Sequence, residues 1–249
     1  METVTQHAKR VGWFALDTVL PPRCLGCGAI VADQGALCPA CWREVTFLAP
    51  PRCAVCGFPF EAAPAEDARC GACLAAPPPY DRARAALAYD AASRPLVTRF
   101  KHADRLDAAP AFAAWMARAA ADLPRPSVIA PVPLHRRRLF RRRYNQAAVL
   151  ARELGPRLGG TVVPDLLVRR RDTPSQGAFS PAGRARNVAG AFAVHPRRAG
   201  WADRTRVLLV DDVFTTGVTL EACARRLRAA GAAGVDAVTL ARVPQPRPR

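Results

Sequence analysis

The sequence is poor in lysine, in acidic residues and in long apolar runs. Only two of its 37 basic residues are lysines, Lys9 and Lys101, and 20 acidic residues leave a formal net charge of +17. A field of this sign attracts polyanions. No apolar run reaches the roughly 18 residues that a membrane-spanning helix needs, which argues against an integral membrane protein. Aromatic residues make up only 7% of the chain, so few side chains are available to stack on nucleobases.

A cleavable secretion signal is also not apparent. The apolar stretch Val11–Leu16 is short and Asp17 follows it at once, so we predict that residues 1–20 form an amphipathic helix. A weak contact of this helix with a membrane surface is the alternative. We expect a cytoplasmic protein, and 249 residues can form one full domain and a small one.

A repeated cysteine pattern is the first strong feature. Eight of the nine cysteines lie in Cys-x-x-Cys pairs, and each half of residues 21–76 reads Cys-x-x-Cys-Gly, a spacer, then Cys-x-x-Cys. Two residues between paired cysteines let both sulfurs reach one ion from a tight turn, which predicts two structural zinc ribbons. The repeat favours Cys24, Cys27, Cys38 and Cys41 as ligands of one zinc ion, and Cys53, Cys56, Cys70 and Cys73 as ligands of the other.

Two alternatives to this zinc assignment stay open. Crossed pairing of the Cys-x-x-Cys units would also satisfy every ligand position, and disulfides would use the same cysteines. The absence of a secretion signal argues against disulfides. The ninth cysteine, Cys223, is interpreted as a small buried hydrophobic residue rather than a nucleophile.

Strand-like and helical patterns alternate after the proline-rich linker at 77–79. The order predicts an α/β domain over residues 80–243, with a largely parallel sheet and helices on both faces, followed by a disordered tail at 244–249. Strands are expected at residues 84–89, 127–132, 165–168, 191–194, 207–210 and 235–240. Helices are expected at residues 93–102, 104–122 and 145–158, and after residue 219.

The run Arg206–Leu220 carries the clearest functional signal. A buried strand at Val207–Val210 is followed by Asp211 and Asp212, then by a threonine-rich turn that opens a helix. Free backbone N–H groups at a helix N-terminus bind anions such as phosphate. Paired carboxylates can accept hydrogen bonds from vicinal sugar hydroxyls, so the run predicts a site for a phosphorylated ribose. The alternative is a structural turn with an ordinary N-cap threonine.

A basic segment follows another expected strand. Residues 127–132 run into Pro133, Leu134 and His135 and then into RRRLFRRRYNQ (136–146), which we interpret as a loop at the ligand edge of the sheet. Its backbone amides and arginines could hold a second polyanion. A solvated basic loop is one alternative. Single-stranded nucleic acid is another, because Phe140 and Tyr144 lie among the arginines. The candidate nucleic-acid contacts are Arg136, Arg137, Arg141, Arg142 and Tyr144.

The segment between the expected strands at 165–168 and 191–194 is long and polar. Such loops often close over a site and exclude water. Gln176, Arg184 and Asn187 are its candidate ligand contacts, with a purely structural role as the alternative.

Taken together these motifs resemble one family. The acidic and threonine-rich run is similar to the phosphoribosyl pyrophosphate (PRPP) signature of type I phosphoribosyltransferases. With PVPLH (131–135), YNQ (144–146), RRDTPSQ (170–176), Arg184–Asn187, GAF (190–192) and the double zinc ribbon, the chain resembles the competence-associated ComF family over roughly residues 13–242.

The resemblance implies a role for each motif. Asp211 and Asp212 would act on the ribose hydroxyls as the catalytic pair, and the segment after residue 132 would meet pyrophosphate and Mg²⁺. The PRPP-binding set would be Val213, Thr215, Thr216, Gly217, Val218, Thr219, Pro133, Leu134, His135 and Lys101. One departure is Arg143, because the family commonly has glycine before the aromatic residue of its YNQ-like motif.

The resemblance also implies a place in DNA uptake. Phosphoribosyl transfer is the expected activity, with single-stranded DNA and a helicase or other uptake component as expected partners. The alternative is a non-catalytic module that senses PRPP or a nucleotide while it binds single-stranded DNA.

Overall fold

The computed structural model describes residues 21–62, 65, 67–101, 106–171 and 190–244. The predicted N-terminal helix, the tail beyond residue 244, and the loop candidates Gln176, Arg184 and Asn187 lie outside these residues.

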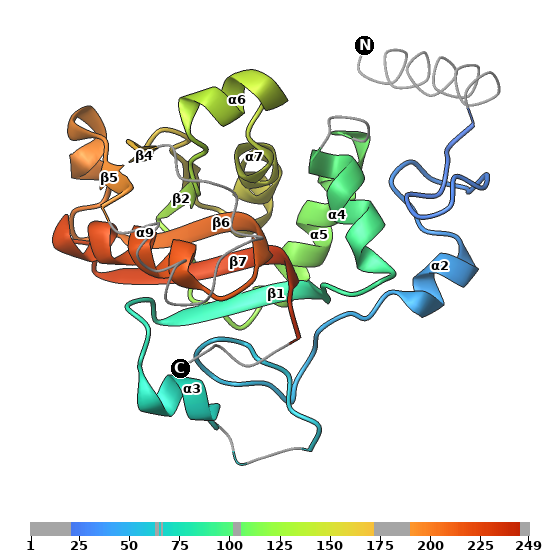
Figure 1. Cartoon of the computed structure of the whole chain (residues 1–249), viewed down its shortest axis with the longest axis horizontal. Helices are drawn as coiled ribbons and strands as arrows, with labels where there is room; N and C mark the ends of the chain where they lie inside the picture. Colours follow the sequence, from blue (N-terminus) through green and yellow to red (C-terminus); the bar gives the residue numbers. More distant parts are fainter. Residues whose placement is uncertain (1–20, 63–64, 66, 102–105, 172–189, 245–249) are drawn as a thin grey trace, which may run out of the picture.

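A five-stranded parallel sheet forms the centre of the larger domain (Figure 1). Its strands lie in the order β1-β7-β6-β2-β3, and Leu209 of β6 pairs with Ala130 of β2 on one side and with Ala237 of β7 on the other. Strands with both faces covered read as continuous apolar runs, which is why the short runs in the sequence identify them. The strands are β1 (Arg82–Ala88), β2 (Val128–Pro131), β3 (Thr161–Val162), β6 (Arg206–Phe214) and β7 (Gly234–Arg242).

Three helices cover one face of this sheet. They are α4 (Ser93–Lys101), α5 (Ala109–Ala119) and α7 (Gln146–Leu158), with a short 3₁₀ turn, η1 (Leu106–Ala108), before α5. Helix α5 is shorter than predicted because it begins only beside Pro110, a residue favoured in the first turn of a helix. Their apolar sides bury Phe100, Phe112, Met116, Leu150 and Leu154 against β2, β6 and β7.

The other face carries α9 (Val218–Ala229) and a small hairpin. Leu220, Cys223 and Leu227 of α9 are buried against the sheet, so Cys223 is a core residue as predicted. The hairpin pairs β4 (Leu167–Arg169) antiparallel with β5 (Phe192–Val194) and is separate from the main sheet. A 3₁₀ helix, η3 (Pro196–Trp201), follows it. Helices on both faces of a parallel sheet confirm the predicted fold class.

Two local predictions were wrong. The basic segment after β2 is not a loop but helix α6 (Arg136–Arg142), because arginine and leucine favour helix and His135 caps it by accepting from the Arg137 N–H at 3.4 Å. The acidic pair does not follow β6 but lies inside it, because β6 stays paired with β7 as far as Phe214.

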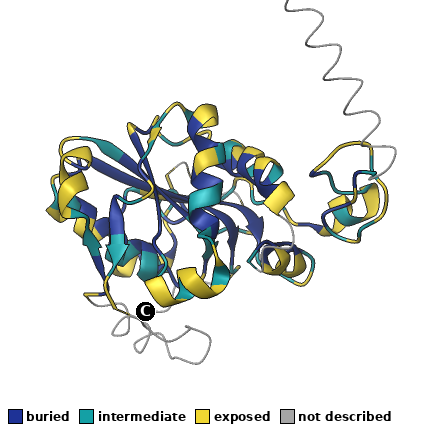
Figure 2. Ribbon diagram, turned by 90° about the horizontal axis from the view of Figure 1, so that it is seen from above, coloured by how far each residue is buried: buried dark blue, intermediate teal, exposed yellow. Residues whose placement is uncertain are grey.

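The two cysteine-rich ribbons lie outside the sheet. The first contains α2 (Pro39–Glu44) and the second contains α3 (Gly71–Ala75), which lies below β1 in Figure 1. The burial colouring in Figure 2 shows the buried sheet at the centre and mostly exposed residues around α2. None of the helices in the described residues combines the length and apolar character required to cross a bilayer.

Candidate functional site

The eight paired cysteines gather into two groups of four. Within each group the sulfurs all lie within 4.8 Å of one another, and the groups follow the uncrossed pairing. Tetrahedral Zn–S bonds of about 2.3 Å place neighbouring sulfurs about 3.8 Å apart. The Sγ–Sγ distances of 3.7 Å between Cys27 and Cys38 and 3.6 Å between Cys56 and Cys70 match that geometry. Both groups therefore fit zinc, and each has a full set of four thiolates.

Each cluster is built on the same backbone turn. In the first, the Gly28 N–H donates to the Cys24 carbonyl at 3.0 Å, and in the second, the Gly57 N–H donates to the Cys53 carbonyl at 2.9 Å. Both glycines have positive φ, +81° and +69°, the left-handed region that glycine adopts without steric cost. The Cys-x-x-Cys-Gly repeat thus encodes the turn that presents two sulfurs to one ion.

A cavity of about 200 Å³ lies at the carboxyl ends of β2 and β6. It brings together both sequence motifs for phosphate binding, which are separated by about 80 residues. Ten of the predicted site residues line it: Lys101, Pro133, Leu134, Arg142, Asp211, Asp212, Val213, Thr215, Gly217 and Thr219. Four cationic side chains and two carboxylates face this space, so it suits a ligand with several negative charges and hydroxyl groups.

The acidic pair sits beside the single described lysine. Lys101 Nζ, at the end of α4, lies 3.2 Å from Asp212 Oδ2, and the Asp212 N–H donates to Asp211 Oδ1 at 2.9 Å. Burial, reinforced by the negative charge of Asp212, raises the pKa of Asp211 to about 8. Near neutral pH Asp211 therefore holds its proton, and Asp212 is the member of the pair that contacts Lys101.

The YNQ motif holds the end of α4 in place. The Tyr144 hydroxyl donates to the Phe100 carbonyl, and Gln146 Nε2 donates to the Lys101 carbonyl at 3.0 Å. Asn145 Nδ2 donates to the Val132 carbonyl at 3.0 Å, which ties the motif to the end of β2. Tyr144 and Gln146 thus position Lys101 against Asp212, and Asn145 fixes the motif to the end of β2.

The threonine-rich turn forms the start of α9. Gly217 is the N-cap residue with φ +84°, and no side chain caps the helix, which leaves its first-turn N–H groups directed at the cavity end. Thr216 is 9% exposed, and its Oγ1 has no hydrogen-bond partner among the described residues. Buried hydroxyls are normally hydrogen-bonded, but Thr216 does not line the cavity. Its neighbours Thr215, Gly217 and Thr219 do, and they are the residues of the turn that face the candidate site.

Several cavity residues were not predicted. Arg138 and Arg169 line the cavity, and so do Asn145 and Gln146. Arg138 and Arg142 lie four residues apart, the spacing that puts two side chains on one helix face. A helical interpretation of the basic segment would have identified Arg138 from the sequence.

The remaining predicted residues lie close by. Val218 begins α9. His135 and Arg136 line a neighbouring cavity of about 880 Å³, and Pro133 and Leu134 line both cavities. Of the nucleic-acid candidates, Arg141 lies beside Phe140, and Arg137 lies in the first turn of α6. Tyr144 is half-buried because its hydroxyl binds the Phe100 carbonyl, whereas Phe140 is 89% exposed.

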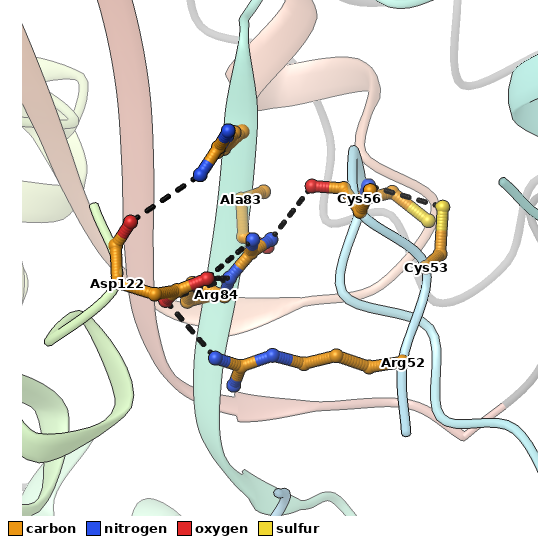
Figure 3. A network of polar contacts seen from close by, with 8 residues as sticks. Arg52, Cys53, Cys56, Ala83, Arg84 and Asp122 are labelled. Atoms are coloured by element: carbon orange, nitrogen blue, oxygen red, sulfur yellow. Dashed lines mark hydrogen bonds and ion pairs between the residues drawn. The ribbon is translucent and has the colours of Figure 1, made fainter. Parts of the chain in front are cut away.

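The second ribbon is anchored to β1 by a charged network (Figure 3). Arg84, which is 4% exposed, donates to both carboxylate oxygens of Asp122 and to the Ala54 carbonyl of the ribbon at 3.1 Å. Arg52 of the ribbon contacts the same carboxylate at 3.0 Å. Partial burial acts to raise the pKa of Asp122, but the two arginines outweigh it and lower that pKa.

Comparison with known proteins agrees with this architecture. Residues 15–74 match the double zinc ribbon domain, and residues 145–249 match the phosphoribosyl transferase domain. The fold and the two metal clusters thus define a phosphoribosyltransferase-like protein with an N-terminal double zinc ribbon.

The curated relatives identify the family. The chain is 33% identical to the DNA utilization protein YhgH of Salmonella typhi over 230 residues, covering 90% of this chain and 98% of the relative. It is 30% identical to competence protein F of Haemophilus influenzae over 227 residues, covering 88% and 96%. The chain belongs to the ComF family. Among solved structures, adenine phosphoribosyltransferase from Thermoanaerobacter pseudethanolicus is 16% identical, with a TM-score of 0.36 over 57% of this chain and 83% of that one.

Proposed function

We propose that the protein binds PRPP with Mg²⁺ in the 200 Å³ cavity and acts in DNA uptake. The observation that carries the proposal is the convergence of an acidic pair, four cations and the uncapped start of α9 at one sheet edge. In this arrangement Asp211 and Asp212 meet the ribose hydroxyls, and the turn 215–219 meets the 5′-phosphate. The segment after β2, with Arg138 and Arg142 of α6, meets the pyrophosphate.

The site supports phosphoribosyl transfer. A nitrogen nucleophile would form a bond to the anomeric carbon while the bond from that carbon to the pyrophosphate oxygen breaks. Pyrophosphate would leave with the bonding electrons, and the nitrogen would give up its proton to water. Positive charge develops on the sugar in the transition state, and the carboxylate of Asp212 would stabilise it. Carboxylate oxygens are also suitable ligands for Mg²⁺ that accompanies the pyrophosphate.

Calorimetric titration with PRPP and Mg²⁺ tests the binding. The double variant Asp211→Ala with Asp212→Ala should lose at least about 100-fold in affinity while it keeps the zinc content and melting temperature of the wild type. Asp33→Ala, at an exposed position in the first ribbon, is the matched control. Wild-type affinity in the double variant would refute the site assignment.

Release of pyrophosphate from PRPP with a panel of nucleobases tests for turnover. Release that depends on one base would identify the acceptor. PRPP binding without release for any base would favour the non-catalytic sensing module instead.

Helix α6 supports a second function, the binding of single-stranded DNA. Phe140 is 89% exposed and lies with Leu139 between Arg136, Arg141 and Arg143. An exposed aromatic ring among cations can stack on a base while the arginines contact phosphates. The names of the two curated relatives, which refer to DNA utilization and competence, are consistent with this partner.

Titration of labelled single-stranded DNA at several salt concentrations tests this second function. Affinity should fall with a slope of about −0.7 per neutralised phosphate in a log–log plot. Phe140→Ala should weaken binding about tenfold, since stacking on one base contributes about 1–3 kcal/mol. Leu74→Ala, at a 65% exposed apolar position on α3, is the control. Affinity that does not depend on salt would exclude this mode.

The cellular setting follows from these two functions. A cytoplasmic protein that binds incoming single strands would meet a helicase or another component of the uptake machinery. Thiolate zinc sites suit that reducing compartment, and eight of the cysteines gather into two such sites.

A further inference from the structure

Arg242 is a buried cation that lacks an ordinary counter-ion. It is the last residue of β7 and is 1% exposed. Its Nη1 donates to the Cys56 carbonyl at 2.7 Å, and its Nη2 lies 3.8 Å from Cys56 Sγ. Within the described residues no carboxylate pairs with Arg242, and its Nε has no hydrogen-bond partner. Burying an unpaired charge in a protein interior is costly, so the charge must be balanced by another group.

The second cysteine cluster can supply that balance. Cys53, Cys56, Cys70 and Cys73 are all buried and fit one zinc ion. Four thiolates around Zn²⁺ carry a net charge of about −2. Hydrogen bonds to metal-bound thiolates from residues outside the coordination sphere are a common support of metal sites. Arg242, with its Nη2 at Cys56 Sγ, therefore adds a charged hydrogen-bond donor to the backbone donors of this cluster and supplies a counter-charge.

The other side of Arg242 contacts the phosphate-binding turn. The Arg242 Cζ lies 4.3 Å from the centroid of the Phe214 ring, a cation–π geometry, and 5.7 Å from that of Phe58 in the ribbon. Phe214 ends β6, is 2% exposed and lines the candidate cavity. It pairs in register with Arg242, and Thr215 and Thr216 follow it directly.

We infer that Arg242 is a positioning residue that connects the second zinc cluster to the phosphate-binding turn, so that zinc at this cluster holds Phe214 and the turn behind it in the ligand-binding conformation. The consequence for ligand affinity rests on the proposed function, whereas the mechanical link does not. Within the part of the chain that the structure describes, no buried arginine connects the first cluster to the site in this way. Arg99 of α4, which contacts the first ribbon, is exposed and donates to the Gly26 carbonyl at 2.8 Å.

Stepwise zinc removal from the full-length protein tests the mechanical link. Zinc is counted by native mass spectrometry, and amide hydrogen exchange is followed in residues 211–220. The starting protein is Cys27→Ser, which should retain only the second zinc. Removal of this zinc by a chelator should raise exchange in the turn several-fold, while exchange in β2 stays unchanged. Unchanged exchange in the turn, or an equal rise in β2, would overturn the link.

Substitution of Arg242 tests the same link with zinc present. Arg242→Met removes the charge and the two donors, and Arg242→Lys keeps the charge. Exchange in the turn should be fastest in the methionine variant and intermediate in the lysine variant, and the second zinc should leave faster under chelator challenge in both. Arg99→Met is the matched control at the first cluster. If Arg242→Met fails to fold, Arg242→Lys and the chelator experiment still test the link between the second zinc cluster and the turn. Wild-type exchange in Arg242→Lys together with unchanged exchange on zinc loss would refute the inference.

Calorimetry with PRPP and Mg²⁺ then separates this inference from the proposed function. If the wild type binds PRPP, Arg242→Lys should bind it about tenfold more weakly. Equal PRPP affinity in the two proteins, with unchanged hydrogen exchange in the turn, would leave the proposed function intact and overturn the inference. If the wild type does not bind, the proposed function fails, and the exchange and zinc-release data alone decide the inference.

Discussion

The two zinc ribbons share a local structure but differ in what surrounds it. In the second ribbon all four cysteines are buried, whereas in the first only Cys24 is buried and Cys27 is exposed. The second ribbon contacts β1 and β7 through Arg84 and Arg242, two side chains with exposures of 4% and 1%. The first is linked to α4 by the exposed Arg99 and packs Leu25 into the main core. The cysteine repeat thus determines the geometry of each metal site. The residues packed around each ribbon determine how strongly the stability of the larger domain depends on that site.

Removal of one ligand from each ribbon should give the largest contrast. Cys56→Ser should lose one zinc, because one of its four ligands is gone, and Arg242 at the end of β7 should become exposed. Zinc binding at such sites contributes about 10–16 kcal/mol to local folding, so the stability of the whole domain should fall. Cys27→Ser should also lose one zinc but leave the melting of the larger domain almost unchanged. Native mass spectrometry and thermal denaturation measure both effects. Equal melting temperatures for the two variants would contradict the proposed difference.

The two turn glycines offer a more conservative comparison. An added Cβ at Gly28 would meet no atom within 4 Å, whereas at Gly57 it would lie 2.6 Å from the Ala83 carbonyl oxygen of β1. Both alanine variants incur about 1 kcal/mol for the left-handed backbone. Gly57→Ala should incur about 2 kcal/mol more because the ribbon must move away from the sheet. Urea denaturation measures the difference, and similar losses in both variants would show that the second ribbon is not closely docked.

The Asp122 carboxylate, which contacts Arg84 of β1 and Arg52 of the second ribbon, allows a third test of how the second ribbon is anchored. Asp122→Asn should destabilise the protein by about 2 kcal/mol, because it leaves the buried Arg84 without its charged partner. Since the pKa of Asp122 is lowered in the folded state, this stabilisation is present above the usual aspartate pKa and is lost as pH falls through the lower folded value. Denaturation at pH 7 and pH 3 should therefore show a smaller difference between variant and wild type at the lower pH. A difference that does not change with pH would exclude Asp122 as the charged anchor.

The sequence predicted the elements whose signals are local. The apolar runs of β6 and β7, the cysteine turns and the apolar side of α7 each depend on residues a few positions apart, and all are present. The convergence of Lys101 with Asp212 depends on hydrogen bonds from Tyr144 and Gln146 to the end of α4. No local pattern encodes such contacts between distant segments.

The basic helix shows a different reason for failure. Charge suggested a loop, but arginine favours helix, and α6 ends at Arg143 with φ +65°. The glycine expected from the family resemblance would adopt this conformation without strain, whereas arginine incurs about 1–2 kcal/mol. Arg84 and Arg242 were missed for a related reason. Arginine is almost never buried without partners, and the partners of these two, among them Asp122 and the Cys56 carbonyl, lie far away in the sequence.

The smallest effect should come from Arg99, the α4 residue that contacts the first ribbon. Arg99→Ala removes the hydrogen bond to the Gly26 carbonyl, but the side chain is exposed, and water can replace the lost donor. We expect a loss below about 1 kcal/mol and no change in zinc content, measured by urea denaturation and native mass spectrometry. Arg84→Ala, which removes a buried donor to the second ribbon, is the matched comparison and should cost at least about 2 kcal/mol. If Arg99→Ala proved as damaging as Arg84→Ala, the first ribbon would be as firmly anchored as the second, and burial of the cluster would not explain the difference between the two ribbons.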